Sequence, residues 1–97
     1  MDGLLSRLYN HPAAFVYKLP ENLDLRIGAL GEPMAVVVHA IKRVGVTVGQ
    51  NILVTGAGTM GLLSFKVAKV FGADKVVVAD INEARLKLVS LFGANAS

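Results

Sequence analysis

Residues 54–61 constrain the fold of this chain more than any other stretch of its sequence. They read V-T-G-A-G-T-M-G and place Gly56, Gly58 and Gly61 directly after an apolar run that ends at Val54. Glycines at this spacing permit a sharp turn, a close approach of the backbone to another molecule, and tight packing of a helix on a strand. The segment therefore predicts a strand that passes through a glycine-rich turn into a helix.

The residues around this turn predict one βαβ unit. The span from Asn51 to Asp80 is thirty residues long, which is the size of one βαβ crossover. We expect strands over 52–54 and 75–79, joined by a helix over 61–71. Short and wholly apolar strands are typical of a parallel sheet that is buried on both faces. The fold class is therefore α/β, and two parallel strands make only part of a doubly wound sheet.

The flanking segments predict further helices. Asp24 is a candidate N-cap for a short helical turn, and Pro33 indicates the start of a second helix that Gly45 ends. A further helix is expected over 82–92. The apolar run 15–17 favours a short strand. The fold expected is a truncated Rossmann domain, its first βαβ unit preceded by these helices.

An acidic residue at the end of the second strand completes a dinucleotide-binding pattern. Asp80 follows Gly61 by nineteen positions, where such units carry an acid that binds the adenosine ribose while amides of residues 58–61 face the pyrophosphate. A carboxylate here repels a 2′-phosphate, which favours NAD over NADP. The alternative interpretation is that the glycines form an ordinary βα turn and Asp80 caps the next helix.

Charge and composition argue against other classes. Ten Lys and Arg stand scattered against seven Asp and Glu, which gives no basic stripe for nucleic acid. The absence of cysteine excludes disulfides and Cys-ligated zinc within the chain. Residues 44–65 carry no formal charge, but five glycines interrupt them, and no signal-peptide pattern precedes them. We expect a cytoplasmic protein with no membrane partner. Its hydrophobic content of 54% is high for so small a domain and suggests part of something larger.

Four blocks of sequence together resemble the sorbitol (polyol) dehydrogenase branch of the zinc-dependent medium-chain alcohol dehydrogenases. The resemblance covers essentially the whole chain from about Asp2. It implies an oxidoreductase that converts a secondary alcohol of a polyol to a ketone and passes hydride to NAD, with a zinc ion polarising the substrate oxygen. The blocks are Y-N-H-P-A-A-F-V-Y-K-L-P-E-N, G-A-L-G-E-P-M-A-V-V-V-H-A, V-T-G-A-G-T-M-G and V-V-V-A-D-I-N.

The resemblance also implies roles for individual residues. Arg85 matches a basic residue that contacts the adenosine ribose, and Glu32 matches the acid near the zinc, a role that applies only in a full-length enzyme. Thr59 stands where the family often has proline, and its backbone amide can still serve. The implied cofactor-binding residues are Gly56, Gly58, Thr59, Met60, Gly61, Asp80 and Arg85.

The same resemblance sets the expected domain organisation. The family's zinc-binding cysteine and Gly-His-Glu motif belong to a catalytic domain that this sequence lacks. Residues 1–23 are expected to be an interdomain segment from the edge of that domain, and residues 24–97 the N-terminal half of an NAD(P)-binding Rossmann domain. We expect no catalytic residue here and no activity from the chain alone. Neither the particular polyol nor the oligomeric state is predicted.

Other interpretations stay open. The chain could be a non-catalytic paralogue that pairs its sheet edge with a full-length relative, since unpaired strand edges and exposed apolar surface favour association. A flavin- or NADP-binding Rossmann segment is disfavoured by Asp80 and by the E-P block. His11 is expected to be structural, and His39 to be a packed core histidine. Tyr17 could relay a proton in principle, but the sequence offers it no partner.

Overall fold

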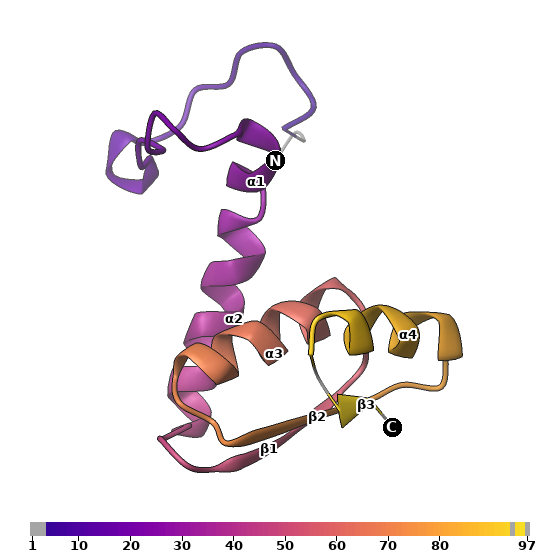
Figure 1. Cartoon of the computed structure of the whole chain (residues 1–97). Helices are drawn as coiled ribbons and strands as arrows, with labels where there is room; N and C mark the ends of the chain where they lie inside the picture. Colours follow the sequence, from indigo (N-terminus) through magenta and orange to yellow (C-terminus); the bar gives the residue numbers. More distant parts are fainter. Residues whose placement is uncertain (1–3, 94, 97) are drawn as a thin grey trace.

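The computed structural model describes residues 4–93 and 95–96. Their C-terminal part forms a parallel sheet with helices packed on one side of it (Figure 1). Within the described residues, three strands lie in the order β1–β2–β3, and all neighbours run parallel. This confirms the α/β fold class. The elements in chain order are a 3-10 helix η1 (Ala13–Phe15), α1 (Leu25–Gly28), α2 (Gly31–Val44), β1 (Asn51–Thr55), α3 (Thr59–Val70), β2 (Lys75–Ala79), α4 (Glu83–Leu91) and β3 (Asn95–Ala96).

In the part of the chain that the structure describes, the sheet contains one strand more than the sequence predicts. Strand β1 pairs with β2 along its whole length, from Asn51 opposite Lys75 to Thr55 opposite Ala79. Two residues of β3 then pair with the middle of β2. Their polar and small side chains, Asn and Ala, lack the apolar β-branched signal by which strands are recognised in sequence.

The faces of the sheet are unequal. Val76 and Val78 are buried beneath the helices, whereas Leu53 on the alternate face is 65% exposed. Successive side chains of a strand point to opposite faces of the sheet, so burial alternates along the strand when helices cover one face only. The expectation that β1 is buried on both faces is therefore wrong in this structure.

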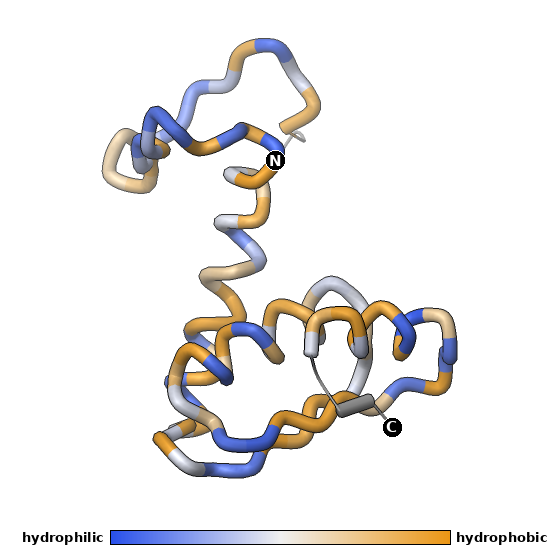
Figure 2. The backbone as a smooth tube through the Cα atoms, viewed as in Figure 1, coloured by the Kyte–Doolittle hydropathy of each residue, from blue (hydrophilic) through white to orange (hydrophobic). Residues whose placement is uncertain are grey.

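Helices α3 and α4 pack on the sheet and form its core, and α2 packs against α3 (Figure 1). Hydropathy follows this arrangement, because apolar residues run along β1, β2 and α3 (Figure 2). The buried core residues are Val37, Ile41, Val46, Ala57, Phe65, Val67, Ala68, Ala73, Val76, Val78 and Val89.

Helix α2 is amphipathic and ends as the sequence predicts. Val37 and Ile41 are buried one turn apart, and Gly45 closes the helix at φ +77° with its N–H bonded to the Ile41 carbonyl at 3.2 Å. The helix begins at Gly31, so Pro33 lies within its first turn rather than at its first position. His39 is exposed, and the expectation of a core histidine is wrong because its side chain lies outside the stripe that faces α3.

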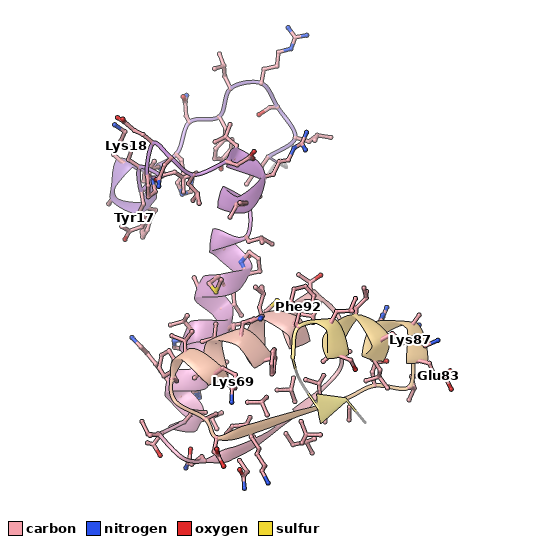
Figure 3. All side chains as sticks on the ribbon, viewed as in Figure 1. Tyr17, Lys18, Lys69, Glu83, Lys87 and Phe92 are labelled. Carbon is pink, nitrogen blue, oxygen red and sulfur yellow. The ribbon has the colours of Figure 1, made fainter. Side chains whose placement is uncertain are left out.

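The N-terminal segment lies apart from the sheet, as the positions of Tyr17 and Lys18 show (Figure 3). Asp24 caps α1 as predicted, accepting a hydrogen bond from the Arg26 N–H at 2.6 Å. The strand expected over 15–17 is absent from the described residues: Ala13–Phe15 form a 3-10 turn instead. No neighbouring strand is available there to complete a ladder.

Candidate functional site

The candidate site lies where β1 and β2 end. A cleft at this place is lined by the last residue of each strand and by the residues that follow. In open parallel sheets, ligands bind beyond the carboxyl ends of the strands. The lining residues are Thr55, Gly56, Ala79, Asp80 and Ile81.

The glycine turn has the geometry that the sequence predicts. Gly56 adopts φ +100°, a conformation that side chains resist, and its N–H bonds to the Ala79 carbonyl at 2.7 Å. A β-carbon on Gly61 would overlap the carbonyl oxygen of Gly56 and lie 2.8 Å from its carbonyl carbon. These two glycines are therefore required by the protein itself, one for the turn and one for the close approach of α3.

Gly58 differs from its two neighbours in the motif. It is the N-cap of α3, at φ −75° and ψ −171°, which is extended backbone that any residue can adopt. A β-carbon here would meet no protein atom within 4 Å. The internal packing of the described chain gives no reason for glycine at position 58.

The N-terminus of α3 presents backbone amides without a side-chain cap. Helices α1 and α4 are capped by Asp24 and Asn82, whereas no side chain accepts a hydrogen bond at the start of α2 or of α3. Thr59 and Met60, the first residues of this helix, are exposed. Uncapped N–H groups and the helix dipole together favour an anion at such a terminus.

The carboxylate of Asp80 holds this site together. One oxygen, Oδ2, accepts the Ala57 N–H at 2.7 Å, and the other, Oδ1, accepts the Asn82 N–H at 2.8 Å. The Arg85 guanidinium lies 3.8 Å from Oδ2. Only 7% of the Asp80 side chain is exposed, against 57% for Arg85. The amide of Ala57 above all, and then that of Asn82 and the charge of Arg85, hold the pKa of Asp80 below its usual value of 3.8.

Asn82, rather than Asp80, caps the following helix. Its side-chain oxygen accepts the N–H groups of Ala84 and Arg85 at 3.0 and 3.2 Å. The simple capping interpretation of Asp80 is therefore wrong. The shorter of its two backbone hydrogen bonds reaches back to Ala57, which is 23 residues away in sequence.

The sequence-predicted residues thus fall into two groups. Those of the glycine motif surround the carboxyl ends of β1 and β2 together with Asp80 and Arg85. Glu32 lies elsewhere, exposed in the first turn of α2. Within residues 4–93 and 95–96, no three His, Cys, Asp or Glu side chains gather into a group that could hold a metal. No helix of that part has both the length and the apolar character for a bilayer crossing.

Sequence reasoning missed three contributors to the site. The N–H of Ala57 binds the Asp80 carboxylate, and the side chain of Asn82 caps α4. Ile81 is fully exposed and lines the cleft. Asn82 had a readable signal, since asparagine directly before a helix is a preferred N-cap. No local pattern indicates Ala57, because only the folded turn brings its amide to Asp80.

Two curated relatives match the chain along almost its whole length. Human sorbitol dehydrogenase is 49% identical over 94 residues, 97% of this chain and 26% of that protein. D-xylulose reductase A of Aspergillus niger is 45% identical over 96 residues, 99% of this chain and 27% of that protein. No protein-family model matches. The resemblance to the sorbitol dehydrogenase branch is confirmed, and the chain spans about a quarter of the length of these relatives.

Solved structures agree with this homology. An alcohol dehydrogenase of Escherichia coli in complex with NADH superposes with a TM-score of 0.84 and 30% identity, covering 90% of this chain and 26% of that one. A Sinorhizobium meliloti protein bound to NADP gives a TM-score of 0.77 and 30% identity, covering 82% and 23%. The chain therefore has the architecture of one segment of nicotinamide-dependent dehydrogenases.

Proposed function

We propose that residues 24–97 form the first half of an NAD-binding Rossmann domain of a polyol dehydrogenase-like oxidoreductase. Residues 1–23 would be the segment that enters it from a catalytic domain. The observation that carries the proposal is the junction at Asp80. An ionised carboxylate, the glycine turn and an uncapped helix N-terminus meet at the carboxyl ends of two parallel strands, which is where such sheets bind dinucleotides.

The dinucleotide would lie across this cleft with each part facing matching chemistry. The pyrophosphate would meet the amides at the start of α3, and the open space beside Gly58 supports a close backbone approach. The adenosine ribose would donate its hydroxyls to Asp80, with Arg85 alongside. Ile81, fully exposed in the lining, offers an apolar surface to the adenine ring.

The charge at Asp80 supports NAD rather than NADP. A 2′-phosphate would approach the Asp80 carboxylate, which its lowered pKa keeps ionised at neutral pH. The two negative charges would repel each other. The Arg85 cation lies against the same carboxylate. The positive charge of Arg85 is therefore already partly neutralised and attracts a 2′-phosphate less strongly. We therefore infer tighter binding of NAD than of NADP.

The described residues do not provide the zinc chemistry of the relatives' family. A catalytic zinc takes three protein ligands as a rule, and no such group of side chains exists among these residues. Glu32 is exposed at the start of α2 and could approach a metal only with ligands from other segments. We infer that this chain contributes cofactor binding and that the oxidation of a polyol or other secondary alcohol belongs to the full-length enzyme.

Calorimetric titration of NAD into the chain and into Asp80→Ala tests the proposal. Loss of a carboxylate that accepts two ribose hydroxyls should weaken binding about ten- to hundredfold. Glu83→Gln is the matched control, because it removes one exposed acidic charge nearby without touching the cleft lining. Equal NAD affinity in the chain and in Asp80→Ala would refute the assignment.

A second candidate is a non-catalytic partner of a full-length dehydrogenase. Strand β1 lies at the edge of the described sheet, and Leu53 at its centre is 65% exposed. An uncharged edge strand of this kind favours pairing with another chain. Size-exclusion chromatography with light scattering, with and without full-length sorbitol dehydrogenase, tests this candidate. A monomer that leaves the elution of the enzyme unchanged would refute it.

A further inference from the structure

We propose that Asp80 is a positioning residue for the pyrophosphate-binding turn, in addition to its part in ribose binding. Its carboxylate fixes the Ala57 amide and thereby sets the shape of the glycine turn before any ligand arrives. This inference rests on the proposed function for the identity of the ligand. The contact between Ala57 and Asp80 is observed in the structure whatever the ligand is.

The contact joins segments that are distant in sequence. Ala57 lies inside the turn between β1 and α3, whereas Asp80 directly follows β2. The bond between the Ala57 N–H and Asp80 Oδ2 is 2.7 Å long, and Ala57 itself is only 2% exposed. An amide as buried as this one is destabilised when it loses its protein acceptor. The acceptor at this position is therefore a structural requirement of the turn.

Two hydrogen bonds fix the turn to the end of β2. The first runs from the Gly56 N–H to the Ala79 carbonyl at 2.7 Å, and the second is the Ala57 bond to Asp80. Ala57 stands between Gly56 and Gly58, residues whose backbone has the greatest conformational freedom. Without the carboxylate, one of these two hydrogen bonds disappears. The amides at the start of α3 would then lose their fixed direction.

The carboxylate can hold the turn and bind a ribose at the same time. Each oxygen accepts one backbone N–H, from Ala57 or from Asn82, and a carboxylate oxygen has room for a second donor. Arg85 approaches Oδ2 at 3.8 Å, beyond hydrogen-bond length. Ribose hydroxyls could therefore join the two amides without displacing them.

Inorganic pyrophosphate separates positioning from simple charge. It contains no ribose, so it probes only the anion site at the start of α3. If Asp80 acts by charge alone, Asp80→Ala removes a repulsive neighbour and strengthens pyrophosphate binding. If Asp80 positions the turn, the same substitution weakens binding, about two- to tenfold for the loss of one organising hydrogen bond. Glu83→Gln removes an equal charge in the first turn of α4 and should leave affinity equal or slightly higher.

The experiment combines this titration with amide hydrogen exchange at Ala57 in the full chain. We expect the Ala57 amide to be protected in the unmodified protein and to exchange faster in Asp80→Ala. Asp80→Asn keeps a single side-chain oxygen for the two amides of Ala57 and Asn82, so its Ala57 protection should lie between the other two. Pyrophosphate or NAD binding that is undetectable in the unmodified chain would overturn the proposed function, while Ala57 exchange would still report on the turn.

Three results would overturn the positioning role. One is an unprotected Ala57 amide in the unmodified protein. Another is equal Ala57 exchange in all the variants. The third is pyrophosphate binding by Asp80→Ala that matches or exceeds that of Glu83→Gln. If Asp80→Ala does not fold, the comparison moves to Asp80→Asn, in which Ala57 must exchange faster than in the unmodified protein and pyrophosphate must bind no more tightly than it binds Glu83→Gln.

Discussion

The carbonyl oxygen of Gly56 occupies the space that a β-carbon on Gly61 would need. The end of β1 and the first turn of α3 are thus in direct backbone contact, and the contact leaves no flexible side chain to give way. Gly61→Ala should therefore destabilise the protein, by about 1–3 kcal/mol as for other overpacked sites. Urea unfolding followed by circular dichroism measures this loss, and a variant as stable as the parent would contradict the close approach.

Gly58→Ala should have the opposite profile. A β-carbon at position 58 meets no protein atom within 4 Å, and its backbone is extended, so the free energy of unfolding should stay within about 0.5 kcal/mol of the parent. A pyrophosphate at the start of α3 would collide with the new methyl group, so NAD affinity should fall. Parallel unfolding and NAD titrations separate the two effects. A variant that keeps its full NAD affinity would place the dinucleotide elsewhere.

The contrast between these glycines shows how far sequence reasoning reaches. The strand, turn, helix, strand and acid follow from local periodicity and from residues with special backbone freedom, and the structure places each as expected. The bond from Ala57 to Asp80 and the exposure of Leu53 could not be predicted in this way. Both depend on which segments meet in space, whereas a local apolar run gives the same signal on an open face as on a covered one.

Asn82→Ala should lower stability by removing the cap of α4. The Asn82 side chain accepts the N–H groups of Ala84 and Arg85, and loss of such a cap costs about 0.5–2 kcal/mol. Asn82→Ser, which keeps a capping oxygen, should recover most of this loss. Thermal unfolding of the three proteins measures the difference. Equal losses in both variants would show that the cap is not the source.

The hydrogen bonds of Asp80 make part of the stability dependent on pH. The Ala57 amide, then the Asn82 amide and Arg85, lower the pKa of Asp80 in the folded protein below 3.8, so folding favours the ionised form. This contribution is complete above about pH 5 and is lost as the pH falls through the lowered pKa. The stability advantage of the protein over Asp80→Asn should therefore be constant near neutrality and shrink in acid. Urea unfolding from neutral to acidic pH tests this, and a difference that does not change with pH would contradict it.

Leu53→Lys tests whether the edge of the sheet is a docking surface. Leu53 is 65% exposed at the centre of β1, and its neighbours Ile52 and Val54 pack against the core. A lysine can extend into solvent there, so the substitution should change folding stability little. It places a charge on an otherwise uncharged edge strand, and charges on edges oppose strand pairing.

If β1 pairs with another chain, Leu53→Lys should therefore weaken the association seen by light scattering. Val44→Lys is the matched control, because Val44 is also an exposed apolar residue, at 78%, but ends α2 rather than lying on the sheet. Equal effects of the two lysines would show that the association depends on exposed apolar surface in general and not on β1. An effect confined to Leu53→Lys would assign the association to β1, an edge strand of the described sheet whose outer backbone groups another strand could pair.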